Sequence, residues 1–397
     1  MIQLVLFIIL TVLSAAALIW TLFLSVFCAI SRVRKKTKPK RLMRLKKAVI
    51  FLVMTIMLNA GLIAISQLTA STPRIVDENG NTPENSIAEL TKVELNGRKQ
   101  WISIRGWDNN APVLLFLAGG PGGTQMAAVR YELAELEKHF VVVNWDQPGS
   151  GKSYYAEKTK NITAQTYIKD GYALTEYLKE RFSQDKIYLV GESWGSALGI
   201  FLVEKYPESY YALIGTGQMV DFAETERIDY AKAIEIAQSK GDTALIERLN
   251  SNGEPPYYGK DVTWKSAVYL NYLSAYMAAN PGIQNPGYNT FRDVGSSEYG
   301  LLDKLNFFRG IVNTYNHVYQ QLYTIDMRTD YTKLDVPVYF FLGRYDVNAP
   351  TVLVEEYVQV LDAPDKRIVW FEHSGHSPWI NEPDKFVTEV LSCFSEN

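Results

Sequence analysis

A serine flanked by two glycines stands between a strand-like stretch and a helix-like stretch of the chain. The apolar run 187–190 is short enough for a buried strand, the pentapeptide 191–195 reads Gly-Glu-Ser-Trp-Gly, and residues 197–203 have helical spacing. Glycines at both ends let a strand and a helix approach closely and leave Ser193 exposed on a sharp turn, as a nucleophile requires. Ordinary glycine turns contain the same pattern, so the pentapeptide alone does not separate a catalytic serine from a structural one.

A serine nucleophile needs a histidine that takes its proton and an acid that orients the histidine. In a strand–serine turn–helix arrangement the acid and then the histidine follow the serine along the chain. Asp346 comes directly after the predicted strand 337–342, while His373 and His376 both come after the predicted strand 367–371. We favour His376, because a glycine before it leaves the loop free to turn. The competing interpretations are a helix-capping aspartate and a histidine in a surface loop.

A glycine-rich loop offers backbone N–H groups to the same site. The loop 119–123 reads Gly-Gly-Pro-Gly-Gly and follows the apolar stretch 112–118. The tetrahedral intermediate of acyl transfer carries an oxyanion that is stabilised by the N–H of the residue after the nucleophile and by an N–H from such a loop. We therefore expect an oxyanion hole formed by Trp194 and the loop 119–123, with a plain tight turn as the alternative.

Strand-like and helix-like stretches alternate along most of the chain after residue 90. Asn96-Gly97 between two alternating stretches predicts an antiparallel hairpin, and the later apolar runs are typical of strands buried on both faces. This alternation predicts an α/β fold with a mostly parallel sheet and helices on both faces. The expected strands are 92–95, 100–105, 112–118, 140–145, 187–190, 211–215, 337–342 and 367–371, and the expected helices include 124–139 and 165–182.

The interval 218–331 interrupts the alternation with helical spacing and many aromatic residues. A long helical insertion between two parallel strands predicts a cap over the carboxyl ends of the strands, where ligands bind in open α/β sheets. We expect most of its aromatic side chains to form the core of the cap rather than a substrate wall. The catalytic core then comprises 91–217 and 332–397, and the polar stretch 71–90 is a linker.

Two long uncharged stretches, 2–30 and 48–68, precede this core. As helices they would extend ~43 Å and ~31 Å, enough for a bilayer core of ~30 Å. The segment 31–47 between them holds ten Lys or Arg residues and no acid, so the positive-inside rule places it in the cytoplasm. We expect a two-span anchor in the cell membrane with the catalytic domain outside the cell. A cleaved signal peptide is the alternative, which the absence of a basic residue before the first stretch disfavours.

Charge and composition exclude several classes of function. After residue 47 the chain carries 30 basic and 43 acidic residues, an excess that disfavours nucleic-acid binding. No His, Cys or Asp cluster has the spacing of a metal site, so we expect neither a metal nor another cofactor. The stretch 146–153 ends like a Walker A loop, but Asp146 replaces its first glycine and a poor helix follows, so we reject nucleotide binding.

Five motifs in a fixed order make the chain resemble the proline iminopeptidase family of α/β-hydrolases, which are serine aminopeptidases. The resemblance covers roughly residues 90–395 and implies a triad of Ser193, Asp346 and His376, with the N–H groups of Gly120 and Trp194 as the oxyanion hole. In that family a glutamate near the start of the cap binds the α-ammonium group of the substrate, and Glu224 and Glu226 are the candidates here. The motifs are Gly119-Gly-Pro-Gly122, Asp146-Gln-Pro-Gly-Ser-Gly-Lys-Ser153, Gly191-Glu-Ser-Trp-Gly-Ser196, Gly343-Arg-Tyr-Asp346 and Ser374-Gly-His-Ser377.

The sequence therefore predicts a membrane-anchored serine hydrolase that releases N-terminal residues from short peptides. Two departures from the family pattern, Ala118 in place of histidine and Glu192 in place of a small residue, leave the preference for proline open. One alternative is an esterase or amidase that acts on small non-peptide substrates with the same triad. Another is a non-catalytic surface module that retains the fold.

Overall fold

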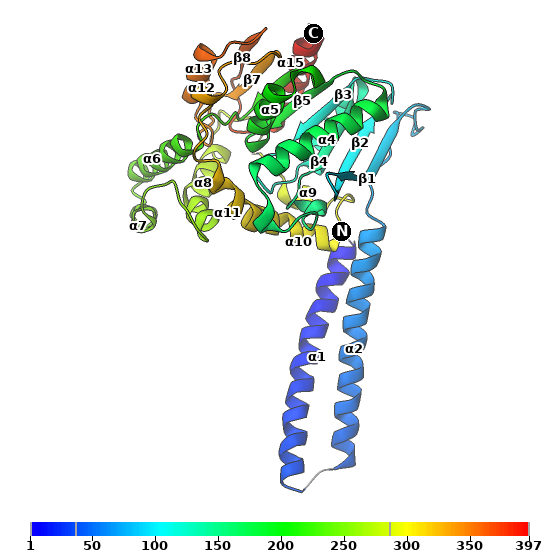
Figure 1. Cartoon of the computed structure of the whole chain (residues 1–397). Coiled ribbons are helices and arrows are strands. Elements are labelled where there is room, and N and C mark those ends of the chain that lie inside the picture. Colours follow the sequence, from blue (N-terminus) through cyan, green and yellow to red (C-terminus); the bar gives the residue numbers. More distant parts are fainter. Residues whose placement is uncertain (1, 36–37, 286, 396–397) are drawn as a thin grey trace. The chain divides into compact units, whose positions relative to one another are not determined.

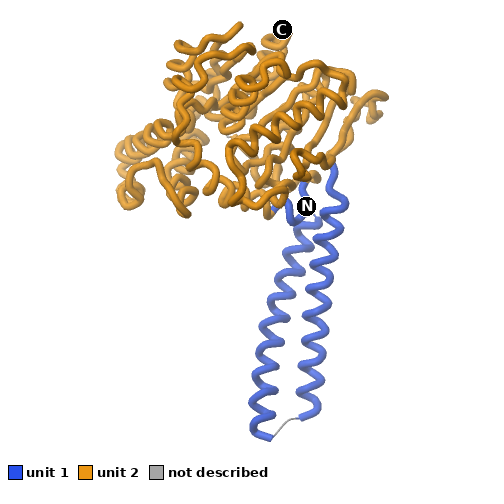
Figure 2. Tube along the Cα trace, viewed as in Figure 1, with its two compact units in different colours: residues 1–71, 299–304 blue, residues 72–298, 305–397 orange. Residues whose placement is uncertain are grey.

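The computed structural model describes residues 2–35, 38–285 and 287–395, and it divides into two compact units (Figure 2). Unit 1 comprises residues 1–71 and 299–304, and unit 2 comprises residues 72–298 and 305–397. The boundary at residue 71 lies next to the end of the predicted two-span segment, 1–70.

Unit 1 is built from two long helices, α1 (Ile2–Val33) and α2 (Pro39–Leu68). Both are long and apolar enough to cross a membrane, a property that a signal sequence near the N-terminus shares. The Asn59 amide donates a hydrogen bond to Ser14 Oγ over 3.2 Å, which links the two helices. The helices extend well into the predicted basic loop 31–47, because Lys and Arg are good helix formers and proline suits the first helical position.

Unit 2 contains an eight-stranded sheet in the order β1-β2-β4-β3-β5-β6-β7-β8. β1 and β2 form the predicted antiparallel hairpin, β2 is also antiparallel to β4, and all other neighbours are parallel. β1 begins inside the stretch 71–90 that we expected to be a linker. The strands are β1 (Ile87–Leu95), β2 (Arg98–Gly106), β3 (Val113–Leu117), β4 (Val141–Asp146), β5 (Ile187–Glu192), β6 (Tyr210–Thr216), β7 (Val338–Gly343) and β8 (Lys366–Phe371).

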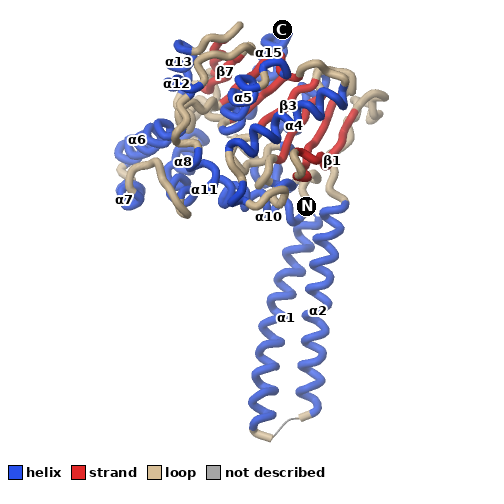
Figure 3. Tube along the Cα trace, viewed as in Figure 1, coloured by secondary structure: helices blue, strands red, loops and turns tan. Residues whose placement is uncertain are grey.

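Helices cover both faces of the sheet, as the apolar strands predict (Figures 1 and 3). Along β3, Val113, Leu115 and Leu117 pack with α4 (Ala164–Phe182), α5 (Trp194–Lys205) and α13 (Thr351–Val360). Leu114 and Phe116 point to the opposite layer, which holds α3 (Met126–Glu132) and α15 (Pro383–Ser395). The helix expected at 124–139 is divided into α3 and a 3-10 turn, Ala134–Lys138. The expected α/β-hydrolase fold class, with its mostly parallel sheet, is confirmed.

Between β6 and β7 the chain is helical, as the sequence pattern predicts for the cap. Helices α6, α7 and α8 share their own apolar core, which contains Tyr230, Leu249, Tyr257 and Tyr269. The elements of this interval are α6 (Phe222–Lys240), α7 (Thr243–Asn252), α8 (Val262–Ala278), α9 (Thr290–Gly295), α10 (Leu301–Arg309), a π-helical turn (Gly310–Thr314), α11 (Tyr315–Val318), a 3-10 turn (Tyr319–Gln321) and α12 (Met327–Asp330).

Candidate active site

Ser193 lies on the turn between β5 and α5. Its backbone angles, φ 53° and ψ −121°, are rare for residues other than glycine. The glycines around it are required by close packing. A Cβ on Gly191 would collide with the carbonyl of Gly195, and a Cβ on Gly195 would collide with the carbonyl of Leu117 in β3. The turn therefore holds Ser193 at the carboxyl end of the central strands in a strained conformation, which is how a nucleophilic serine is presented.

His376 and Asp346 come together from two separate loops. His376 Nδ1 lies 3.0 Å from Asp346 Oδ2 and 3.2 Å from Oδ1. Asp346 Oδ1 also accepts hydrogen bonds from the backbone N–H groups of Asn348 (2.8 Å) and Ala349 (3.0 Å). These two amides hold the carboxylate in place, so its position beside the imidazole does not depend on His376 alone.

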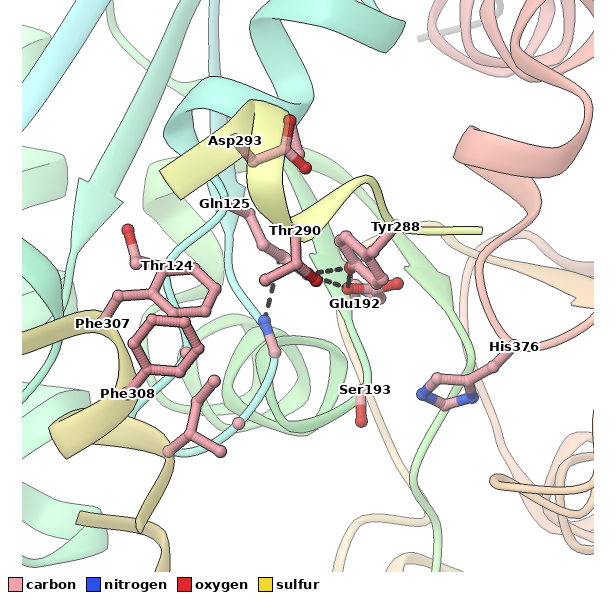
Figure 4. A pocket seen from close by; sticks show the side chains of 15 residues that line it. Thr124, Gln125, Glu192, Ser193, Tyr288, Thr290, Asp293, Phe307, Phe308 and His376 are labelled. Carbon is pink, nitrogen blue, oxygen red and sulfur yellow. Dashed lines mark hydrogen bonds between the residues drawn. The ribbon is translucent and has the colours of Figure 1, made fainter. Parts of the chain in front are cut away.

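Ser193 and His376 line the same pocket, and the imidazole points toward the serine (Figure 4). The two side chains, both in the described part of the chain, do not hydrogen-bond to each other, a common feature of sites without substrate, in which catalytic contacts tighten on binding. Burial lowers the pKa of His376, but the charge and hydrogen bond of Asp346, with a smaller effect of Glu192, raise that pKa to about 9 overall. Asp346 thus favours the imidazolium that forms when His376 accepts a proton.

The glycine loop between β3 and α3 forms another side of this pocket. Gly120 has φ +135°, and a Cβ there would lie 2.6 Å from the amide nitrogen of Gly123. The N–H of Gly119 donates to Gln125 Oε1 over 3.1 Å, which holds the loop against the start of α3. Trp194 is the first residue of α5, so its N–H has no partner within the helix. The structure therefore brings the two predicted oxyanion donors to the same edge of the sheet as Ser193.

The pocket has a volume of about 450 Å³, and several cap residues contribute to it. We expected the cap aromatics to form the cap core; Tyr257 and Tyr269 do, but Tyr288, Phe307 and Phe308 line the pocket. The other lining residues are Gly119, Gly120, Gly123, Thr124, Gln125, Ala128, Glu192, Ser193, Thr290, Asp293, Ile311 and His376.

Asp293 on α9 is a pocket residue that sequence reasoning missed. It is 5% exposed; Oδ1 accepts a hydrogen bond from Arg292 Nε (2.8 Å), and Oδ2 has no recorded partner in the described part of the chain. Burial raises the pKa of Asp293, and Arg292 partly offsets this. A lone aspartate on a short cap helix carries no motif, so no signal in the sequence could have singled it out.

The two predicted amine-binding glutamates are engaged elsewhere in the cap, and neither lines this pocket. Glu224 accepts a hydrogen bond from Arg328 Nη2 over 2.5 Å. Glu226 is fully buried and accepts hydrogen bonds from Tyr319 (3.0 Å), Ser266 (3.1 Å) and Tyr269. Burial raises the pKa of Glu226, and the hydroxyl groups around it partly offset that effect.

The Walker-like stretch 146–153 has a structural role, because its hydrogen bonds connect neighbouring loops of unit 2. The buried Asp146 accepts hydrogen bonds from Thr124 Oγ1 and from the N–H of Lys152 (2.7 Å). A short 3-10 turn, Gly151–Ser153, follows in place of an α-helix.

Among the described residues, no group of three or more His, Cys, Asp or Glu side chains could hold a metal ion.

Comparison with known proteins agrees with this geometry. Residues 112–236 match the family model of the alpha/beta hydrolase fold. The chain is 33% identical to the "Probable aminopeptidase YbaC" of Bacillus subtilis (strain 168), over 77% of this chain and 96% of that protein. It is 29% identical to the proline iminopeptidase of Saccharolobus solfataricus, over 73% and 86% of the two chains. The crystal structure of a Mycobacterium smegmatis proline iminopeptidase has the same fold, with a TM-score of 0.56 and 18% identity over 78% of this chain and 98% of that one. The chain therefore belongs to the proline iminopeptidase-like family of α/β-hydrolases and is a serine hydrolase.

Proposed function

We propose that this protein is a membrane-anchored aminopeptidase of the proline iminopeptidase type that releases N-terminal residues from short peptides outside the cell. The observation that carries the proposal is the small pocket in which Ser193 and His376 lie together with the buried carboxylate of Asp293. A pocket of about 450 Å³ has the size of a small-ligand site, which suits the first residues of a short peptide. A substrate bound there presents its first residue, and the rest of the peptide leaves.

Asp293 is our candidate for the group that binds the α-ammonium of the substrate. The oxygen Oδ2 has no recorded partner among the described residues, so a substrate cation could pair with it without displacing an existing contact. A charge-assisted hydrogen bond is stronger than one between neutral groups. Because Glu224 and Glu226 do not line the pocket and Asp293 does, we assign the amine site to Asp293 in place of either of them.

The proposed reaction follows from the positions of the side chains. Ser193 Oγ attacks the carbonyl carbon of the first residue while His376 accepts the hydroxyl proton, and Asp346 stabilises the resulting imidazolium. The N–H groups of Gly120 and Trp194 stabilise the oxyanion. His376 then donates the proton to the departing peptide amine, which leaves an acyl group on Ser193. Water, activated by the same histidine, releases the free amino acid and regenerates the serine.

The walls of the pocket indicate which side chain the first residue carries. Phe307 and Phe308 (Figure 4), together with Ile311, supply an apolar surface in the same pocket as the catalytic groups. Burial of an apolar side chain or a proline ring there is favourable by about 25 cal/mol for each Å² of apolar surface removed from water. We expect higher kcat/KM for substrates with proline or another apolar residue at the N-terminus than for charged ones.

A substrate panel tests the proposal. The full-length protein is assayed with aminoacyl arylamides, with the same compounds N-acetylated, and with short acyl esters, and Ser193→Ala serves as the inactive control. We expect turnover of the free-amine substrates and loss of activity on acetylation. Ester turnover without arylamide turnover would instead support the esterase or amidase alternative. A wild type that no fluorophosphonate probe labels would support a non-catalytic module.

The amine site is tested by Asp293→Asn. We expect KM for free-amine substrates to rise at least about tenfold, the equivalent of ~1.4 kcal/mol, while ester hydrolysis changes little. Glu224→Gln is the matched control, because Glu224 is, like Asp293, a cap carboxylate paired with an arginine, but it does not line the pocket. Equal effects of the two substitutions on KM would rule out our assignment of the amine site.

A further inference from the structure

Glu192, the residue before the nucleophile, carries a buried carboxylate that has no role in the proposed reaction. It is 2% exposed, it ends β5, and it contributes to the pocket wall. Within the described part of the chain, Glu192 forms no ion pair with Lys or Arg. A buried carboxylate is costly unless several donors satisfy it, so its hydrogen bonds explain why it is tolerated here.

Four donors from three different chain segments meet this carboxylate. Oε1 accepts from Ser377 Oγ (2.5 Å) and from Trp379 Nε1 (2.9 Å). Oε2 accepts from the hydroxyl of Tyr288 (2.5 Å) and from the side-chain amide of Gln125. Figure 4 shows Gln125 and Tyr288 converging on Glu192 above Ser193.

Each of the three segments carries part of the active site. Gln125 also accepts the N–H of Gly119 (3.1 Å), so Glu192 is connected through one side chain to the oxyanion loop. Ser377 directly follows His376, so the opposite oxygen holds the loop of the catalytic base. Tyr288 belongs to the cap and forms a wall of the substrate pocket.

We propose that Glu192 is a positioning residue that holds the oxyanion loop, the cap loop and the histidine loop in register around Ser193. The inference rests on the catalytic parts proposed for Ser193, His376 and Gly120. A carboxylate suits this task because it accepts hydrogen bonds at both oxygens, and charged acceptors bind more strongly than neutral ones. A small residue at this position could make none of the four contacts. Misplacement of catalytic groups by as little as 1 Å can cost about 100-fold in rate.

The charge of Glu192 affects the pH dependence of kcat/KM, which a residue with a purely structural role would leave unchanged. The charged groups that act on His376 are Asp346, from the loop after β7, and Glu192, from β5, and both raise its pKa. The cap contributes the neutral Tyr288 hydroxyl to the same pocket, and the α6 residue Asp229 interacts with Asp346. Neutralising Glu192 should therefore move the midpoint of the kcat/KM–pH profile to lower pH as well as reduce kcat.

Glu192→Gln is the central test, because it keeps the size of the side chain and removes the charge and one acceptor. We expect kcat to fall about 10- to 100-fold on both amide and ester substrates, with a smaller change in KM and a lower pH midpoint. Glu137→Gln is the matched control, since Glu137 is also buried but pairs with Arg105 over 2.6 Å and does not line the pocket. It should lower stability while kcat per folded molecule and the pH midpoint stay unchanged.

Gln125→Asn gives an independent test if Glu192→Gln does not fold. The shorter side chain cannot span Gly119 and Glu192, so kcat should fall while the pH midpoint stays in place, because the carboxylate remains. Wild-type kcat in folded Glu192→Gln or Gln125→Asn would overturn the proposal, and so would losses of kcat that match the unfolded fraction of the protein.

Fluorophosphonate labelling of the wild type separates the proposed catalytic scheme from the proposed positioning role of Glu192. If the wild type is not labelled, the catalytic scheme fails; if it is labelled and the variants behave as wild type, only the positioning proposal fails.

Discussion

At the scale of single residues, the raised pKa of His376 predicts that its protonation state limits activity at neutral pH. A general base must be neutral to accept a proton, and the pKa of His376 is about 9. Below that value most molecules carry imidazolium, so for an acyl ester, which has no amine of its own to titrate, we expect kcat/KM to rise about tenfold per pH unit and to level off near pH 9. A kcat/KM–pH profile of the full-length protein checks this. A midpoint at or below 6.5, the ordinary histidine value, would contradict it.

Asp346→Asn removes the main charge that opposes deprotonation of His376. An amide still occupies the site, so the loop is expected to keep its backbone hydrogen bonds to Asn348 and Ala349 in part. We expect the pH midpoint to fall toward 6.5 and kcat to fall by about 10⁴, because a neutral partner no longer stabilises the imidazolium or fixes its tautomer. The same pH profile measures both effects, and an unchanged midpoint would show that Asp346 does not face the base.

At the scale of elements, the contact between the serine turn and β3 leaves no room for a side chain at Gly195. A Cβ there would collide with the backbone of Leu117, which cannot move without shifting the sheet. We expect Gly195→Ala to lower the free energy of unfolding by about 1–3 kcal/mol, measured by denaturant titration. Gly295→Ala is the control, since no atom lies within 4 Å of a Cβ at that position. A loss of similar size in both variants would mean that overpacking is not the cause.

The cap helix α6 contains a buried carboxylate, Asp229, which we expect to lower the stability of the protein at high pH. Asp229 is fully buried, neither of its oxygens has a recorded partner in the described chain, and burial together with Glu226 and Asp346 raises its pKa well above 3.8. Because the folded-state pKa is the higher one, folding is favoured at low pH and loses stability as pH rises through that pKa. Asp229→Asn should therefore raise Tm more at pH 8 than at pH 5. An equal change in Tm at both pH values would exclude this linkage.

Local backbone requirements explain which parts of the site the sequence could predict. The serine turn needs glycine at two positions, and the order of acid and base follows from the order of the strands, so the sequence is enough to propose Ser193, Asp346 and His376 as the triad. Asp293 and Tyr288 reach the pocket only through packing of the cap, and no short-range pattern encodes that packing. For the same reason the helix expected at 124–139 begins only at Met126, because the residues before it have tertiary contacts instead, such as those of Gln125 with Gly119 and Glu192.

At the scale of the whole molecule, charge and apolar residues are divided along the chain. The described helices α1 and α2 carry the long uncharged stretches, and all ten basic residues of the segment 31–47 lie between those stretches. The rest of the chain is acidic. This arrangement supports the proposal that the basic segment stays in the cytoplasm while the catalytic unit is outside the cell.

Cysteine accessibility tests this orientation, because the chain has only two cysteines, Cys28 and Cys393. In a background with both changed to serine, single cysteines replace two exposed lysines, Lys40 in the basic segment and Lys240 at the end of α6. We expect a membrane-impermeant maleimide to label Lys240→Cys in intact cells and Lys40→Cys only after permeabilisation. The reverse pattern would invert the proposed orientation. A mature protein whose mass lacks residues 2–30 would show that the first helix is a cleaved signal peptide. Retention of a protein of full-length mass in membranes washed at alkaline pH would support two spans.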